Sequence, residues 1–461
     1  MPELDLSEPR VVHIVGVGGA GMSAIAAVLA RMGHQVSGSD LKDSHALDRL
    51  RLLGVDAHIG HDAAHLPAAV DAVVCSSAIP PTNPEVAAAV DRGVAVLRRA
   101  EALRALVATR RSIAVAGSHG KTTTASMLAL CLRGAGWRPS FLIGGDLNEV
   151  GSNAAYDDGD WLVVEADESD GTFLELAPEA AIVTSVAPDH LDHYERFQTL
   201  VAAFGAFLDA VPGTRVACVD DPVAARLAAA RPGVRTYGWR DRADYRLDAY
   251  AGGRAGSRFQ LHRDGEVLGV VELPVPGRHN ALNAAGAAAA ALELGVGFDD
   301  VARALRGFGG VARRFEFRGE IDGVTIIDDY AHNPGKVAAV LQAAREGGWR
   351  QVVAVFQPHR YSRTATLWRD FADAFVDADQ VVVTDVYPAG EAPQPGVSGR
   401  LVLRAILDAH PATPVTYLPR RSDVVAHALS RARSGDVLVT LGAGDLTTVP
   451  DEWLTAAEAR A

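Results

Sequence analysis

The sequence lacks the features that mark secreted, membrane or nucleic-acid-binding proteins. Its three cysteines (Cys75, Cys131 and Cys218) are far apart, so they support neither a disulfide framework nor a cysteine zinc site. Lys and Arg number 44 against 57 Asp and Glu, and the net charge of −13 excludes the basic surface that nucleic-acid binding needs. With 48% hydrophobic and 22% charged residues, the composition is typical of a soluble globular protein, which we expect to be cytoplasmic.

One apolar stretch, residues 11–30, has about the length of a membrane span. It is interrupted by Gly16, Gly18, Gly19 and Gly21, and the residues before it are mainly acidic, whereas a signal peptide begins with basic residues. We therefore predict a buried strand, a glycine turn and a helix, with no membrane insertion.

Short β-branched runs alternate with alanine-rich stretches of helical length, which is typical of βαβ units and parallel sheets. At about 150 residues per domain, the 461 residues correspond to three domains. Changes in the pattern divide the chain into residues 1–108, 109–312 and 313–461. Within the second domain, Arg258–His262 and Val267–Leu273 flank Asp264-Gly265, which predicts an antiparallel hairpin. We expect three consecutive α/β domains, the central one carrying a small antiparallel β insertion.

A glycine loop follows the first predicted strand. Residues 16–21, Gly-Val-Gly-Gly-Ala-Gly, fit G-x-G-x-x-G, whose glycines let backbone N–H groups approach a diphosphate at a helix N-terminus. Asp40 ends the second predicted strand, where a dinucleotide-binding enzyme holds a ribose hydroxyl. The loop predicts a site for a diphosphate-sized anion without identifying the nucleotide. Taken alone, it also fits an NAD-dependent oxidoreductase or a turn that binds no ligand.

A second glycine loop, Ala116–Thr124, also lies between a predicted strand and a helix. Its backbone amides and Lys121 suit the β- and γ-phosphates of ATP, and the Thr122 hydroxyl suits Mg²⁺. The pattern is a short variant of the phosphate-binding motif, because position 115 is Val where the longer form has Gly. Segments 163–168 and 188–193 place acidic and histidine side chains after the next predicted strands, which suits a divalent cation.

His61 and His65 have the spacing of a zinc-protease helix, with His58 nearby. Asp62 stands where that motif has its catalytic Glu, and Pro67 ends the segment early. We interpret this segment as a solvated surface helix and expect no zinc there.

Six segments together resemble the Mur ligase family. They are Gly16–Ser23, Ala116–Thr124, Glu165–Asp170, Gly277–Asn283, Asp328–Pro334 and Gln357–Thr364. The resemblance extends from about residue 11 to residue 445. It implies a Rossmann-like UDP-binding domain, a central P-loop ATPase domain and a C-terminal Rossmann-like domain that binds the amino acid. It also implies ATP-dependent ligation of L-alanine to the lactyl carboxylate of UDP-N-acetylmuramate through an acyl phosphate, an early cytoplasmic step of peptidoglycan precursor synthesis.

The resemblance assigns roles residue by residue. The sugar nucleotide would contact Gly16, Gly18, Gly19, Ala20, Gly21, Met22, Ser23 and Asp40. ATP would contact Gly117, Ser118, His119, Gly120, Lys121, Thr122, Thr123, His279, Asn280, Asn283, Arg314 and Asp329. Mg²⁺, or alternatively Mn²⁺, would be held by Thr122, Glu165 and His190, and the catalytic residues would be Lys121, His190 and Arg314.

The amino acid would contact His332, Arg360 and Arg363. The chain departs from the pattern at Asn333, where the alanine-adding branch usually has a second His. Two enzymatic alternatives therefore stay open: a recycling ligase that attaches a preformed tripeptide to the same sugar nucleotide, and the NAD-dependent oxidoreductase. A non-catalytic nucleotide-binding module is the third alternative.

Overall fold

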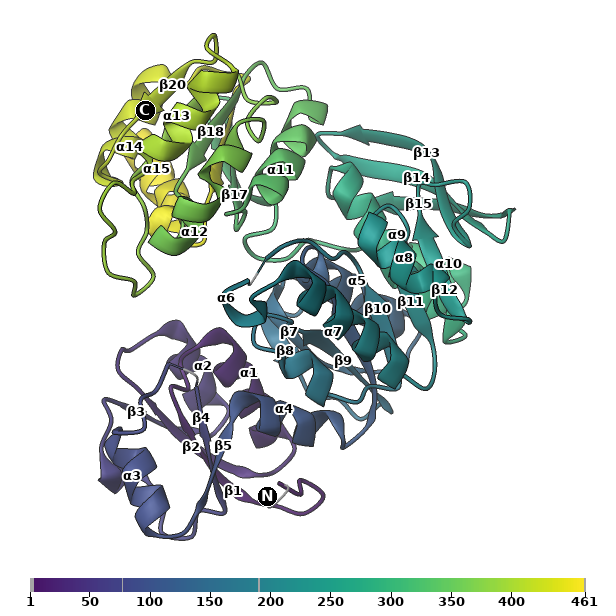
Figure 1. Ribbon diagram of the computed structural model, residues 1–461, viewed down its shortest axis with the longest axis vertical. Coiled ribbons are helices and arrows are strands. Elements are labelled where there is room, and N and C mark those ends of the chain that lie inside the picture. The colour runs from purple at the N-terminus through teal and green to yellow at the C-terminus, as the bar shows by residue number, and fades with distance from the viewer. Residues whose placement is uncertain (1–3, 77, 190, 460–461) are drawn as a thin grey trace. The chain divides into compact units, whose positions relative to one another are not determined.

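The computed structural model describes residues 4–76, 78–189 and 191–459 (Figure 1). Backbone contacts group the chain into two compact units. The first holds residues up to Asp248 together with Gln260–Val271 and Leu282–Gly307. The second holds Ala249–Phe259, Glu272–Ala281 and the chain from Phe308 onward. Three β-sheets with flanking helices make up these units.

The first sheet is parallel and has five strands in the order β3-β2-β1-β4-β5. Its strands are β1 (Val11–Val15), β2 (Gln35–Asp40), β3 (Asp56–Ile59), β4 (Ala72–Cys75) and β5 (Ala95–Arg98). Its helices are α1 (Ala20–Arg31), α2 (His45–Leu52), η1 (Ala63–His65), α3 (Pro84–Asp91) and α4 (Arg99–Val107). The strand order reverses between β1 and β4, so the ligand crevice of such a sheet lies at the carboxyl end of β1. The first glycine loop begins there.

The second sheet has ten strands in the order β15-β14-β13-β12-β11-β10-β6-β9-β7-β8. The strands are β6 (Arg111–Ala116), β7 (Ser140–Leu147), β8 (Ser152–Ala155), β9 (Trp161–Ala166), β10 (Ala180–Val183), β11 (Arg215–Cys218), β12 (Val234–Gly238), β13 (Tyr245–Gly253), β14 (Gly256–Arg263) and β15 (Glu266–Leu273). The helices are α5 (Lys121–Gly134), η2 (Thr172–Glu175), α6 (Leu191–Tyr194), α7 (Phe197–Ala210), α8 (Pro222–Ala229), α9 (Arg278–Glu293) and α10 (Phe298–Arg306). The second glycine loop joins β6, in the middle of this sheet, to α5.

The predicted hairpin is confirmed. Strands β14 and β15 are neighbours in the sheet, and only Asp264 and Gly265 connect them. Both residues have positive φ, 51° and 88°. Two left-handed residues in succession are what a type I′ turn requires, and Asp-Gly tolerates them well.

The third sheet has six strands in the order β16-β17-β21-β18-β19-β20. The strands are β16 (Glu316–Ile321), β17 (Val324–Asp329), β18 (Val352–Phe356), β19 (Gln380–Val383), β20 (Val415–Tyr417) and β21 (Val437–Leu441). The helices are α11 (Pro334–Glu346), α12 (Tyr361–Leu367), η3 (Trp368–Phe371), α13 (Arg400–Ala409), α14 (Ser422–Arg431), η4 (Asp445–Thr448) and α15 (Val449–Glu458). Only β16 pairs antiparallel with its neighbour among the pairings described for this sheet.

The cores follow from the sequence pattern. Strand residues Ile113–Ala116 are completely buried, as expected for a parallel sheet covered on both faces. Every alanine from Ala284 to Ala291 in α9 is at most 1% exposed, because a helix that is apolar on all sides packs in an interior. The prediction of three α/β domains is confirmed, while their residue boundaries stay a prediction. Among the described residues, every helix is too short or too polar to cross a lipid bilayer.

Candidate active site

The first glycine loop is shaped by the end of β2. Gly16 has a φ of 81°, and the N–H groups of Gly16 and Val17 donate to the Ser39 carbonyl oxygen at 2.8 and 3.0 Å. Gly18 donates its N–H to Asp40 Oδ2 at 2.9 Å. Glycine is needed at position 16 because residues with a side chain rarely adopt this φ. The predicted ribose contact Asp40 therefore also holds the loop backbone.

The residues after Gly18 differ in accessibility. Gly19, Ala20 and Gly21 are exposed at the N-terminal end of α1, where backbone amides attract anions. Met22 is 3% exposed and packs in the core, and the Ser23 hydroxyl donates to the Ala20 carbonyl at 3.1 Å. The backbone of the helix start, more than the side chains of Met22 and Ser23, is available to a ligand.

Arg99, which sequence reasoning missed, lies beside this loop. Its Nη1 would be 3.1 Å from a Cβ placed on Gly21, and its Nη2 is 3.3 Å from Asp170 Oδ2. Asp170 follows β9 in the acidic segment of the second sheet. Because both neighbours are more than seventy residues away in sequence, no local pattern identifies Arg99.

The second glycine loop has two glycines in left-handed conformations. Gly117 has a φ of 137° and Gly120 a φ of 83°. A Cβ on Gly117 would clash with Thr184 Oγ1, and a Cβ on Gly120 would clash with Asn283 Oδ1. Both the backbone conformation and the available space therefore require glycine.

The same loop is anchored to the segment after β10. Ser118 donates its N–H to the Ser185 carbonyl at 2.9 Å, and His119 donates its N–H to Ser185 Oγ at 2.9 Å. The Thr184 hydroxyl donates to the His119 carbonyl at 2.5 Å. These bonds fix the loop before any ligand binds.

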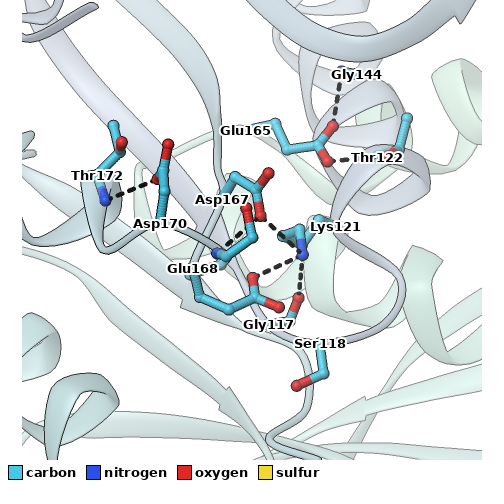
Figure 2. Close-up of polar contacts among 12 residues, drawn as sticks. Gly117, Ser118, Lys121, Thr122, Gly144, Glu165, Asp167, Glu168, Asp170 and Thr172 are labelled. Carbon is cyan, nitrogen blue, oxygen red and sulfur yellow. Dashed lines mark hydrogen bonds and ion pairs between the residues drawn. The ribbon is translucent and has the colours of Figure 1, made fainter. Parts of the chain in front are cut away.

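Lys121 begins α5 and lies among carboxylates (Figure 2). Its Nζ donates to the Gly117 carbonyl and to Glu168 Oε2, both at 2.7 Å, and lies 3.9 Å from Asp167 Oδ1. Burial opposes the charged form, but the facing carboxylates raise the pKa of Lys121 above its ordinary value. Lys121 therefore keeps its positive charge, as contact with a phosphate requires.

The side chains of Glu165 and Thr122 lie next to each other beside the second glycine loop. Thr122 Oγ1 donates to Glu165 Oε1 at 3.1 Å, and the N–H of Gly144 donates to Glu165 Oε2 at 2.7 Å (Figure 2). A hydroxyl beside a carboxylate suits Mg²⁺, which takes few protein ligands and completes its shell with phosphate and water. Among the described residues, no three His, Cys, Asp or Glu side chains form a metal-binding group. The predicted cation ligand His190 lies outside the described residues.

Three residues near the start of α9 were predicted to contact ATP. Asn283 lies against the second glycine loop, with Oδ1 next to Gly120. The amide of Asn280 is buried and donates to the Pro276 carbonyl at 2.8 Å, so it stabilises its own turn. Burial lowers the pKa of His279 to about 4, so this imidazole is neutral at neutral pH.

Asp329, the predicted ribose contact, is at the end of β17. Its two carboxylate oxygens accept the N–H groups of Phe315 and Ala331, each at 2.7 Å. Burial raises the pKa of Asp329 to about 6, against the opposing charge of Arg314. The Arg314 guanidinium lies 5.1 Å from the centroid of the Tyr330 ring. The structure thus brings Asp329 and Arg314 together.

The predicted amino-acid contacts gather in the third sheet. His332 Nδ1 is 2.8 Å from the Tyr330 carbonyl, and its ring centroid is 5.7 Å from that of His359. Arg363 Nη1 donates to His359 Nδ1 at 3.1 Å. Burial and the nearby Arg363 lower the pKa of His359 to about 4 and hold that of His332 well below its usual value. Two neutral imidazoles and an arginine suit a ligand with a carboxylate and an ammonium group.

Two backbone features complete this region. Arg360 has a φ of 68°, which is uncommon for a residue with a side chain, and donates its N–H to the Tyr387 carbonyl at 2.8 Å. Strained residues of this kind concentrate at functional sites. Asn333 is the N-cap of α11, and its Oδ1 accepts the N–H of Lys336 at 3.0 Å. A good capping residue thus stands where a second His was expected.

The interpretation of His61 and His65 as part of a solvated helix is wrong. Only Ala63–His65 is helical, as a single 3₁₀ turn, and the His61 side chain is 10% exposed. Both imidazoles contact Glu85, whose side chain is fully buried. Glu85 comes twenty or more residues later in the sequence, so local spacing gave no sign of it.

Three family models match successive parts of the chain. They are the Mur ligase family catalytic domain at residues 11–111, the Mur ligase middle domain at 115–291 and the Mur ligase glutamate ligase domain at 313–444.

Whole-length relatives agree with these matches. The UDP-N-acetylmuramate–L-alanine ligase of Kineococcus radiotolerans is 50% identical over 452 residues, covering 96% of this chain and 95% of that protein. The crystal structure of UDP-N-acetylmuramate-alanine ligase from Thermotoga maritima is 28% identical, covers 98% of this chain and 100% of its own, and has a TM-score of 0.84. A murein peptide ligase from Psychrobacter arcticus is 25% identical, with coverage of 97% and 98% and a TM-score of 0.69.

Proposed function

Because this chain belongs to the Mur ligase family, we propose that it joins L-alanine to the lactyl carboxylate of UDP-N-acetylmuramate with conversion of ATP to ADP. One observation supports the proposal: in a chain 50% identical to a relative of that name, Lys121 and the Thr122–Glu165 pair lie together at the second glycine loop. We further propose that it acts in the cytoplasm, at an early step of peptidoglycan precursor synthesis, and that its domains are residues 1–108, 109–312 and 313–461.

The chemical difficulty is that a carboxylate is a poor electrophile. Transfer of the γ-phosphoryl group of ATP to the lactyl carboxylate gives an acyl phosphate and ADP. The amine of L-alanine then attacks the acyl carbon, and phosphate leaves as the amide forms. The residues around the phosphoryl group act by positioning it and neutralising its charge.

Charge neutralisation falls to the second glycine loop. Lys121 exchanges its contact with Glu168 for the transferring phosphoryl group, and the backbone amides at the N-terminal end of α5 hold the other phosphates. Mg²⁺ held by Thr122 and Glu165, and a second cation at His190, would neutralise further negative charge. Arg314 and Asp329 would hold the phosphates and ribose of ATP, with His279, Asn280 and Asn283 on the adenine side.

The substrates occupy the other two regions in this proposal. The backbone of Gly19–Gly21, exposed at the N-terminal end of α1, holds the diphosphate of the sugar nucleotide at the crevice of the first sheet. Arg360 and Arg363 bind the alanine carboxylate, since a guanidinium pairs well with that group. The neutral His332 accepts a hydrogen bond from the alanine amine.

ADP release measured with UDP-N-acetylmuramate and ATP tests the proposal. We expect turnover with L-alanine and little with the preformed tripeptide. Turnover with the tripeptide alone would show a recycling ligase. Hydride transfer with NAD, or ATP binding without substrate-dependent hydrolysis, would show that the chain is not a ligase.

A further inference from the structure

A buried carboxylate on α3, beside the first sheet, has no role in the mechanism above. Glu85 is 0% exposed and lies in the first turn of α3, after the N-cap Asn83. Groups from β1, β2 and the segment after β3 converge on it. Its neighbours are His13 Nε2 at 3.6 Å, Ser39 Oγ at 2.5 Å, His61 Nδ1 at 3.4 Å, the Asp62 N–H at 3.2 Å and His65 Nδ1 at 3.1 Å.

The carboxylate is ionised despite its burial. Burial alone would favour the neutral acid, but contacts with His13 and Ser39 lower the pKa of Glu85 to about 2. A buried ion is seldom the most stable choice, because a well-packed apolar residue commonly serves as well. The charge at position 85 therefore calls for a role other than packing.

That role is indicated by Ser39. Its hydroxyl donates to Glu85 Oε2 and lies 2.8 Å from His61 Nδ1, so its position in β2 is fixed from two sides. Its carbonyl oxygen accepts the N–H groups of Gly16 and Val17. A continuous chain of short hydrogen bonds thus runs from Glu85 to the start of the first glycine loop.

We propose that Glu85 is a positioning residue for the sugar-nucleotide loop: Glu85 fixes Ser39, and Ser39 fixes the backbone of Gly16 and Val17. Three histidines complete the shell of the carboxylate: the buried His13 of β1 and the partly exposed His61 and His65 after β3. This inference rests on the proposed function, because it takes UDP-N-acetylmuramate as the ligand of the loop.

The test is a double-mutant cycle with Glu85→Gln and Ser39→Ala. The dissociation constant of UDP-N-acetylmuramate is measured by calorimetry without ATP, so that turnover is not needed. We expect each single variant to weaken binding about tenfold, the size of one charged hydrogen bond. The double variant should bind no more weakly than either single one, because both changes break the same chain of contacts.

Two controls separate positioning from loss of structure. His65→Gln keeps a hydrogen-bond donor facing Glu85 Oε1 and leaves the Ser39 contact with Oε2 in place, so it should leave the dissociation constant within about twofold. The dissociation constant of a non-hydrolysable ATP analogue, which binds the second loop, should be unchanged in all variants. If Glu85→Gln does not fold, Ser39→Ala tests the proposal through the dissociation constants of UDP-N-acetylmuramate and of the ATP analogue.

The outcomes distinguish the two proposals. If the unmodified chain does not bind UDP-N-acetylmuramate, the proposed function is wrong. If it binds and both single variants bind equally well, only the role of Glu85 is wrong. Additive losses, or equal weakening of the ATP analogue, would also overturn the positioning role.

Discussion

The two glycine loops share a local structure and differ in charge. Each joins a buried parallel strand to a helix through a glycine with positive φ. The first has exposed backbone at Gly19–Gly21 and has no lysine. The second contains Lys121, and the carboxylates of Glu165, Asp167 and Glu168 lie beside it in space. The glycine pattern predicts an anion site in both cases. The surrounding side chains determine whether the site is suited only to binding the anion or also to transferring a phosphoryl group.

This difference matches two chemical tasks. In the proposed function, the diphosphate at the first loop stays intact and needs only a fixed backbone, and Ser39 and Asp40 hold that backbone at Gly16, Val17 and Gly18. A phosphoryl group in transfer develops charge that must be neutralised, which needs a mobile cation and a metal site. Three of the four changes below are chosen to affect one task and spare the other, and the remaining change leaves both loops intact.

Lys121→Ala should have the largest effect. Losing the only cation contributed by the loop itself should lower kcat about 1,000-fold, the upper range for removal of one group that stabilises a transition state. The dissociation constant of UDP-N-acetylmuramate should stay unchanged, because the first loop is intact. ADP release and calorimetry on the same preparation check both. Near-normal turnover would refute the assignment of the second loop.

Gly144→Ala should follow in size. A Cβ at this position would lie 2.6 Å from Glu165 Oε2, so the carboxylate must shift from its present position beside Thr122. We expect kcat to fall about 100-fold, and the Mg²⁺ concentration needed for half-maximal activity to rise, because one of few protein ligands is displaced. A Mg²⁺ titration of ADP release measures this. An unchanged Mg²⁺ requirement would mean that Glu165 is not a metal ligand.

Arg363→Ala leaves both loops intact. Loss of a charged contact to the carboxylate of alanine should raise the KM for L-alanine about thirtyfold, with the KM values for ATP and the sugar nucleotide unchanged. Steady-state kinetics with each substrate varied in turn gives the three values. A change confined to the KM for ATP would place Arg363 in the nucleotide site instead.

Gly18→Ala should have the smallest effect. A Cβ there would lie 2.9 Å from both Asp40 Oδ2 and Leu47 Cδ1, which disturbs the first loop without removing a charge. We expect the KM for UDP-N-acetylmuramate to rise about tenfold, the equivalent of one hydrogen bond, and kcat to change little. Comparison with Gly144→Ala is decisive: if both variants impair the same step, the two loops do not have separate tasks.

The strand–glycine–helix units were predictable because the signals are local. Buried β-branched strands, glycines where φ is positive and the Asp264-Gly265 turn all follow from neighbouring residues. Strand β13, for example, was not predicted, because several of its residues are exposed and its sequence lacks a continuous apolar run. Such strands depend on partners elsewhere in the sheet.

The candidate site was predictable only in part. The phosphate loop and its acidic partners follow from motifs, whereas Arg99 and Glu85 gain their surroundings from distant segments. His61 and His65 were misread for the same reason, since solvation of a histidine depends on what the fold brings to it. Asn280 and Asp329 hold their own backbone in place, which no motif shows.

The pairing of Lys121 with Glu168 has a consequence for selectivity. An ammonium that already has a buried counter-ion attracts chloride or single phosphate ions only weakly. We expect that a ligand must bring several negative charges before exchange of partners becomes favourable. If the second glycine loop binds ATP as proposed, the Lys121–Glu168 pair therefore makes the site selective for a nucleoside triphosphate over the small anions of the surrounding solution.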